Sequence, residues 1–221
     1  MIRTAALSLA TAFSLAELGC NAATTATAAA PPESPAQAAQ PATAAAKPSR
    51  ADQEKAGVAA LVGTTPPEWN VERWMSSPPL TLASLRGSVV LVRWWTAGCP
   101  FCSATAPALR SFDRTYGPRG LKVIGMYHHK EATPFDPKVF EATARKYGFT
   151  FPVAFDPDWR TFYSWMRDKS GNAVETGWTS ITFLLDKHGV VRHVHPGGQY
   201  VEGEPSYAEL QAAIDRLLAE N

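Results

Sequence analysis

The sequence predicts an α/β fold in which a mixed sheet carries helices on both faces. Residues 88–95 and 121–127 are nearly continuous apolar runs, which is typical of parallel strands covered on both sides. Residues 181–185 and 190–195 read as two further strands, and the Asp-Lys-His-Gly sequence at 186–189 favours a hairpin between them. Parallel strands followed by an antiparallel hairpin require a sheet of mixed direction.

Helical segments are predicted around these strands. Residues 100–116 follow the first strand and stop before a Gly-Pro pair, and residues 137–147 end at a glycine. Helices are also predicted over 157–167 and 206–219, the latter from apolar residues at helical spacing. A short strand is expected at 151–154. The alternation of strand and helix accounts for helices on both faces of the sheet.

Composition excludes several classes of function. The chain has 221 residues, of which 45% are apolar and 19% charged, which is the profile of a globular protein. Its formal net charge is +1, so no basic field is available to attract nucleic acid. No glycine-rich phosphate loop is evident, and we expect no cofactor. The three cysteines, Cys20, Cys99 and Cys102, are too few for a disulfide scaffold.

The first 20 residues are typical of an export signal, with Arg3 followed by a short run rich in alanine and leucine. Cys20 and the glycine before it resemble the end of a bacterial lipoprotein signal, in which the cysteine is lipidated. Glu17 departs from that pattern, and the alternative is an ordinary secretory signal cut nearby. Either signal places the protein in the bacterial cell envelope, periplasmic or otherwise outside the cytoplasm, and Cys20 is a candidate membrane anchor.

Residues 21–60 are predicted to form a disordered linker. Ala, Thr, Pro, Ser and Gln dominate this stretch, which cannot bury enough apolar surface to offset its ordering entropy. The remaining residues, 61–221, suit one domain. No apolar run reaches the roughly 20 residues that a membrane-spanning helix requires.

Cys99 and Cys102 lie at the junction of a predicted buried strand and helix. With Cys99 at the N-cap and Pro100 in the first turn, the Cys99 sulfur faces free backbone N–H groups and the positive end of the helix dipole. This setting favours a thiolate, the attacking species in disulfide exchange. Cys102, one turn later, is the expected resolving cysteine. Half of a zinc site is the alternative, but it needs two further ligands and the chain has no second cysteine pair; His128 and His129 could supply nitrogen.

Residues 94–102, with the sequence Trp-Trp-Thr-Ala-Gly-Cys-Pro-Phe-Cys, resemble the active-site segment of the thioredoxin superfamily, and specifically its bacterial envelope branch of TlpA/ResA-like thiol-disulfide oxidoreductases. The similarity includes segments within 67–87, the helix-kinking Pro107 and residues 182–189, and it covers about 63–219. It implies a thioredoxin-like fold, dithiol chemistry and protein disulfides as substrates. Since the branch is a reducing one, the resemblance favours a reductant, which a membrane electron donor would have to recharge.

Arg93 departs from the family pattern. It lies six residues before Cys99, where thioredoxins carry a buried aspartate that manages the proton of the resolving thiol. A guanidinium only donates, so Arg93 could stabilise a thiolate but cannot take its proton. A buried arginine is expected to have a carboxylate partner, for which Glu68 and Asp156 are the candidates. The alternative is a side chain that reaches outward to solvent.

Ser180 is the second departure, because it stands where the family carries a cis-proline that aligns the substrate. A cis bond before a non-proline residue costs about 2.5–4 kcal/mol, so the Thr179–Ser180 bond is expected to be trans. The serine N–H and hydroxyl could then contact a substrate backbone or sulfur. Phe101, between the two cysteines, is expected to be exposed and to contact partners.

Four histidines have less specific interpretations. His128 and His129 follow the second predicted strand, where ligand sites of α/β folds gather, and could border the dithiol. His193 and His195 alternate on one face of the last strand and are expected to be solvated.

Two alternative functions stay open at this point. Thr96 stands three residues before Cys99, as in the peroxidatic motif of peroxiredoxins, although Val92 occupies the proline position of that motif. A thiol peroxidase is therefore one alternative. A non-catalytic copper carrier using Cys99, Cys102 and a histidine is the other, although such carriers resemble a longer Cys-x-x-x-Cys spacing.

Overall fold

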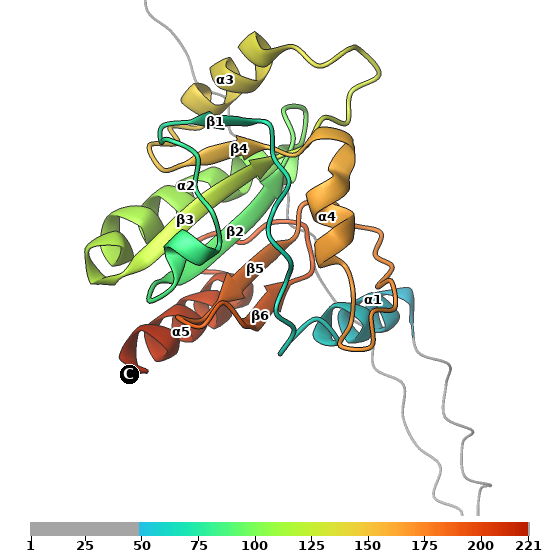
Figure 1. Cartoon of the computed structure of the whole chain (residues 1–221), viewed down its shortest axis with the longest axis vertical. Helices are drawn as coiled ribbons and strands as arrows, with labels where there is room; N and C mark the ends of the chain where they lie inside the picture. Colours follow the sequence, from blue (N-terminus) through green and yellow to red (C-terminus); the bar gives the residue numbers. More distant parts are fainter. Residues whose placement is uncertain (1–48, 221) are drawn as a thin grey trace, which may run out of the picture. The chain divides into compact units, whose positions relative to one another are not determined.

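A computed structural model describes residues 49–220, and their centre is a six-stranded mixed sheet (Figure 1). The strands lie in the order β1-β4-β3-β2-β5-β6. Strands β2, β3 and β4 are parallel, whereas β1, β5 and β6 run antiparallel to their neighbours, which confirms the predicted sheet. Their bounds are β1 Arg73–Met75, β2 Val89–Trp95, β3 Leu121–Tyr127, β4 Val153–Phe155, β5 Thr182–Leu185 and β6 Val191–His195.

Helices cover both faces of this sheet (Figure 1). Because side chains alternate along a strand, β2 sends Leu91 and Trp95 into the core shared with α2, α3 and α5. It sends Val92 and Trp94 into the core shared with α1 and α4. All of β2 is buried, as its apolar sequence predicts. The helices are α1 Arg50–Ala59, α2 Pro100–Tyr116, α3 Pro137–Lys146, α4 Arg160–Trp165 and α5 Pro205–Ala219, with short 3₁₀ turns at Ala83–Leu85, Gly117–Arg119 and Pro157–Trp159.

Helix α1 lies within the stretch that composition assigns to the linker. Ser49 and Asp52 cap its first turn reciprocally, and Val58 and Leu61 at its other end are buried in the core. The folded part therefore begins before residue 61, because α1 is capped and Val58 and Leu61 pack into the core on the α4 side of the sheet. The predicted signal, Cys20 and the remaining linker lie outside the described residues.

Two other elements differ from the sequence prediction. The edge strand β1 was not expected, since its three residues are too short to show a pattern. The single helix predicted over 157–167 is broken, because Asp158 and Trp159, within the 3₁₀ turn that precedes α4, adopt positive φ angles of 52° and 59°. Between residues 49 and 220, none of the helices combines the length and apolar character needed to span a bilayer.

Candidate active site

Cys99 is the N-cap of α2, as the sequence predicts. Its backbone is extended, Pro100 follows in the first helical turn, and its Sγ accepts a hydrogen bond of 3.2 Å from the Cys102 N–H. Strand β2 ends four residues earlier and directs the chain into this turn. The Cys99 sulfur is partly exposed and lies at the positive end of the helix dipole, a setting that stabilises a thiolate.

Cys102 lies one turn further along α2 and is buried, with 2% of its surface exposed. Burial raises the pKa of the Cys102 thiol to about 11, although the charge of Arg93 works in the opposite direction. Cys102 is therefore a protonated thiol at neutral pH. Both cysteines are free in this structure, and they differ in exposure, Cys99 being partly exposed and Cys102 buried.

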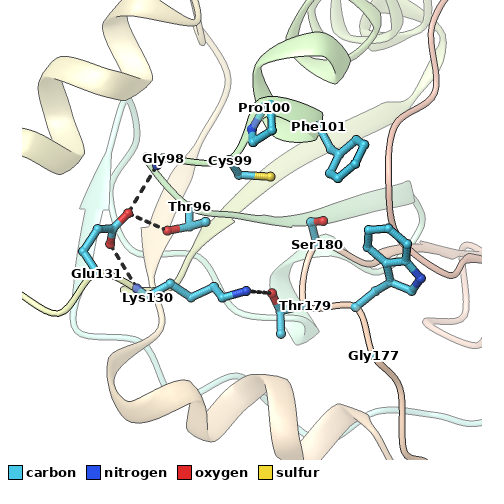
Figure 2. A pocket seen from close by; sticks show the side chains of 11 residues that line it. Thr96, Gly98, Cys99, Pro100, Phe101, Lys130, Glu131, Gly177, Thr179 and Ser180 are labelled. Carbon is cyan, nitrogen blue, oxygen red and sulfur yellow. Dashed lines mark hydrogen bonds between the residues drawn. The ribbon is translucent and has the colours of Figure 1, made fainter.

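A pocket opens in front of the Cys99 sulfur, and three chain segments line it (Figure 2). The first segment is the turn before α2 together with the start of α2. The second is Lys130 and Glu131 in the loop after β3, and the third is residues 177–180 before β5. Among the predicted site residues, the structure brings together Cys99, Pro100, Phe101, Thr179 and Ser180 along this pocket. Cys102 and Arg93 are buried and do not line it.

An aromatic wall forms one side of the pocket. Phe101 is 40% exposed, as expected, and its ring meets the ring of Trp178 edge to face at a centroid distance of 5.5 Å. Trp178 is 37% exposed. Gly197 makes room for it, because a Cβ at residue 197 would lie 2.3 Å from the Trp178 Cβ. Sequence reasoning missed Trp178, and its position two residues before Ser180 was the available signal.

Glu131 anchors the turn that leads to Cys99. Its carboxylate accepts hydrogen bonds from the Thr96 hydroxyl at 3.0 Å and from the Gly98 N–H at 3.2 Å (Figure 2). Burial works to raise the pKa of Glu131, but these bonds and those from backbone N–H groups outweigh it and lower the pKa. Next to it, Lys130 donates to the Thr179 hydroxyl at 3.3 Å. The loop after β3 therefore links the other two pocket segments, the turn before α2 through Glu131 and residues 177–180 through Lys130.

Ser180 is 5% exposed and faces the pocket across from Cys99 (Figure 2). Its position fits the expected contact with a bound substrate. The trans form of the Thr179–Ser180 bond stays a prediction.

Arg93 is fully buried, so the alternative of a side chain that reaches outward to solvent is wrong. Its guanidinium donates to the Thr182 hydroxyl at 3.2 Å and to the Gly198 carbonyl at 2.7 Å, and its Cζ lies 5.3 Å from the centre of the Tyr200 ring. Neutral oxygens and the face of an aromatic ring thus take the place of an anion.

Neither carboxylate expected beside Arg93 is its partner. Glu68 accepts from the Leu82 N–H. Asp156 accepts from the Trp94 indole and from the two N–H groups that begin α4, those of Thr161 and Phe162. Each carboxylate thus accepts hydrogen bonds from backbone N–H groups that have no backbone acceptor in the described part of the chain. Within residues 49–220, Arg93 forms no ion pair.

The histidines next to β3 do not line the pocket, contrary to expectation. His128 is fully buried against the Trp159 ring at a centroid distance of 4.2 Å, and burial lowers its pKa to about 3. His129 contacts Glu131 at 3.0 Å. Residues 130 and 131, rather than the histidines before them, reach the pocket.

His195 is buried rather than solvated, which corrects the interpretation of the last strand. Its ring packs edge to face on Tyr200 at a centroid distance of 5.0 Å. Burial first, and then the charge of Arg93, lowers its pKa to about 4. His195 is therefore neutral at physiological pH. His193 is half-buried, and burial also lowers its pKa.

The two alternative functions gain no specific support from this geometry. The Thr96 hydroxyl, which the peroxidatic motif would direct toward the reactive sulfur, donates instead to Glu131. Within residues 49–220, no group of three or more His, Cys, Asp or Glu side chains is arranged to hold a metal ion.

Comparison with known proteins finds the redoxin family model over residues 73–211. DipZ of Mycobacterium tuberculosis is 29% identical over 159 residues, which make up 71% of this chain and 21% of DipZ. The chain thus spans about a fifth of that relative. The thiol-disulfide oxidoreductase ResA of Geobacillus kaustophilus is 28% identical over 145 residues, which cover 65% of this chain and 73% of ResA.

A solved structure has the same fold. The crystal structure of the thioredoxin-like superfamily protein SPOA0173 matches with a TM-score of 0.54 and 26% identity, over 71% of this chain and 97% of that one. These matches confirm the resemblance to the thioredoxin superfamily and its ResA-like members.

Proposed function

Since this chain belongs to the redoxin family, we propose that it is an exported thiol-disulfide oxidoreductase that exchanges disulfides with protein substrates. One observation carries the proposal: a partly exposed cysteine caps a helix at the edge of a pocket, and a buried cysteine lies one turn behind it. The relatives ResA and YkuV are both named thiol-disulfide oxidoreductases, which supports the same chemistry.

In the reducing direction, the Cys99 thiolate attacks one sulfur of a substrate disulfide. The substrate S–S bond breaks, and its other sulfur leaves with the electron pair and takes up a proton. Cys102 then attacks the Cys99 sulfur of the mixed disulfide. The bond between protein and substrate breaks, the second substrate sulfur leaves as a thiol, and Cys99 and Cys102 become a disulfide. The substrate gains two electrons and two protons. Both electrons come from the protein dithiol, one proton comes from the Cys102 thiol, and the other comes from water, which took up the Cys99 proton when the thiolate formed.

The pocket suits an extended polypeptide better than a small thiol. Phe101 and Trp178 offer an apolar surface for the residue next to a substrate cysteine. Across from Cys99, Thr179 and Ser180 offer hydroxyl groups that can hydrogen-bond a substrate backbone. Lys130 restrains Thr179, so this side of the pocket is preorganised.

The direction and place of action complete the proposal. The ResA-like resemblance favours a reductant, which a membrane electron donor would recharge. The signal-like residues 1–20 support a location in the bacterial cell envelope, with Cys20 as the proposed site of a lipid anchor.

Cysteine variants test this proposal. Reduced Cys102→Ser should accumulate a mixed disulfide with an oxidised protein probe such as insulin, because the resolving sulfur is missing. Cys99→Ser should trap none and lose exchange activity. Equilibration of the unmodified protein with glutathione buffers would give the potential and so the direction. Trapping of insulin by Cys99→Ser but not by Cys102→Ser would refute the assigned roles.

A further inference from the structure

Arg93 lies in a buried polar row on the α2 side of the sheet. Strand register places Arg93 of β2 opposite Thr182 of β5, and Thr182 opposite His195 of β6. Because cross-strand partners share a face, the three side chains lie on one side of the sheet. Leu91 and Trp95 mark this side as the one that packs with Cys102.

Tyr200 connects this row to the helix that carries the cysteines. Its ring lies over the Arg93 guanidinium, and its hydroxyl is 3.2 Å from the Thr182 hydroxyl. Its backbone N–H donates to the Thr105 hydroxyl, which itself donates to the Phe101 carbonyl in the first turn of α2. Cys102 and Tyr200 belong to the same buried core, and Tyr200 links the Arg93 guanidinium to the first turns of α2, the helix that carries Cys102.

The charge of Arg93 has no counterion in this region. Its Nε makes no hydrogen bond within the described residues, and its other contacts are neutral. Burial of an uncompensated charge is costly unless something offsets it. The groups that interact electrostatically with Cys102 are Arg93, Cys99, Tyr147 and Tyr200. Burial raises the pKa of both tyrosines, so neither is an anion near neutral pH.

We propose that Arg93 is a positioning residue for the resolving step, in which its charge stabilises the negative charge that develops on the Cys102 sulfur. This inference rests on the proposed function. In the mixed disulfide Cys99 is bonded to substrate, so Cys102 must give up its proton as it attacks. That proton goes to the departing substrate sulfur, directly or through water, while the Cys99–Cys102 bond forms. A fixed cation lowers the barrier without accepting the proton.

The same charge acts in the reverse direction. When a substrate thiolate attacks Cys99 of the oxidised protein, Cys102 is the leaving sulfur and carries the negative charge. Arg93 therefore accelerates both directions at the Cys102 step. The potential at pH 7 changes little, because Cys102 is protonated in the resting dithiol with or without Arg93.

The test uses oxidised glutathione as the probe. Reduced protein is mixed with it, and the glutathione adduct of Cys99 is followed by acid quenching and mass spectrometry. In Arg93→Gln, which can still hydrogen-bond Thr182, we expect decay of the adduct to slow about tenfold or more, a barrier change of the size that one buried charge supplies. The pH at which decay reaches half its maximal rate should rise. Alkylation of Cys99 by iodoacetamide should stay unchanged.

Two further variants separate charge from structure. Arg93→Lys keeps the cation and should recover most of the decay rate. Arg86→Gln removes an exposed arginine near the opposite end of β2. Its glutathione adduct should decay at the rate of the unmodified protein's adduct. If Arg93→Gln does not fold, Arg93→Met, which fills the same volume, takes its place.

The role of the charge would be overturned if the adduct of Arg93→Gln, or of Arg93→Met in its place, decayed as fast as that of the unmodified protein. It would also be overturned if Arg93→Lys slowed adduct decay as much as the neutral variant. The proposed function fails differently, because the unmodified protein would then form no adduct at Cys99.

Discussion

Each face of the sheet fully buries one Asp or Arg side chain, but the hydrogen bonding of the two differs. On the α4 side, Asp156 receives hydrogen bonds from Trp94, Thr161 and Phe162. On the α2 side, Arg93 is bound by two neutral oxygens and keeps an unpartnered Nε near the dithiol. The hydrogen bonds of Asp156 are used to stabilise the start of α4. The guanidinium of Arg93 has fewer hydrogen bonds than it can donate, so its charge can still act on the neighbouring Cys102.

Each face also buries a neutral histidine, and acid should destabilise both. The pKa of His128 is about 3 and that of His195 about 4 in the folded protein, whereas an exposed imidazole has a pKa of about 6.5. The unfolded chain therefore binds protons first, so stability is complete above about pH 6.5 and falls as the pH drops toward 4. We expect a loss on the order of 3 kcal/mol for each ring.

Urea unfolding between pH 7 and pH 4 measures this loss. His128→Phe and His195→Phe should each reduce the fall in the free energy of unfolding between pH 7 and pH 4, with the larger effect for His128. An unchanged slope in both variants would contradict the burial of neutral rings.

Asp156→Ala should destabilise the protein by about 3 kcal/mol, because it leaves the Trp94 indole and two N–H groups without partners. The exchange rate of the folded fraction should stay unchanged, in contrast to the Arg93 variants. Urea unfolding with insulin reduction measures both quantities. Glu202→Ala, at an exposed position, is the matched control. If folded Asp156→Ala exchanged disulfides with insulin more slowly than the unmodified protein, Asp156 and Arg93 would not differ in the way described.

Glu131→Ala should slow the reaction of Cys99 several-fold, because the Thr96 hydroxyl and the Gly98 N–H lose the carboxylate that holds the turn. The rate of Cys99 alkylation by iodoacetamide measures this effect. Glu141→Ala removes a more distant carboxylate on α3 and serves as the control. Equal alkylation rates in both variants would show that the turn holds its shape unaided.

Trp178→Ala should have the smallest effect, a several-fold rise in KM for insulin with little change in the alkylation of Cys99. The reason is that the variant removes half of the aromatic wall and leaves the sulfur in place. Tyr163→Ala, at an exposed aromatic away from the pocket, should not alter KM. A KM unchanged by Trp178→Ala would remove the aromatic wall from substrate binding.

The strands and helices that flank the dithiol could be predicted because their signals are local. The apolar run of β2, the Cys-Pro sequence at an N-cap and the glycine after the helix over 137–147 each describe one short segment. The edge strand β1 and the break at Asp158 and Trp159 could not be predicted in this way. Their conformations depend on the neighbouring strand β4 and on packing, and three residues carry too little pattern.

Local sequence patterns were enough to predict the fold class, the order of the two cysteines and the placement of Cys99 at a helix N-terminus, since each follows from segments about one turn or strand long. The side chains that surround the cysteines are known only from the folded chain. Trp178, Glu131 and the buried environment of Arg93 come from segments distant in the chain. Burial and long-range contact determine which charges are neutralised and which remain available to the sulfur, and those properties exist only after the chain has folded.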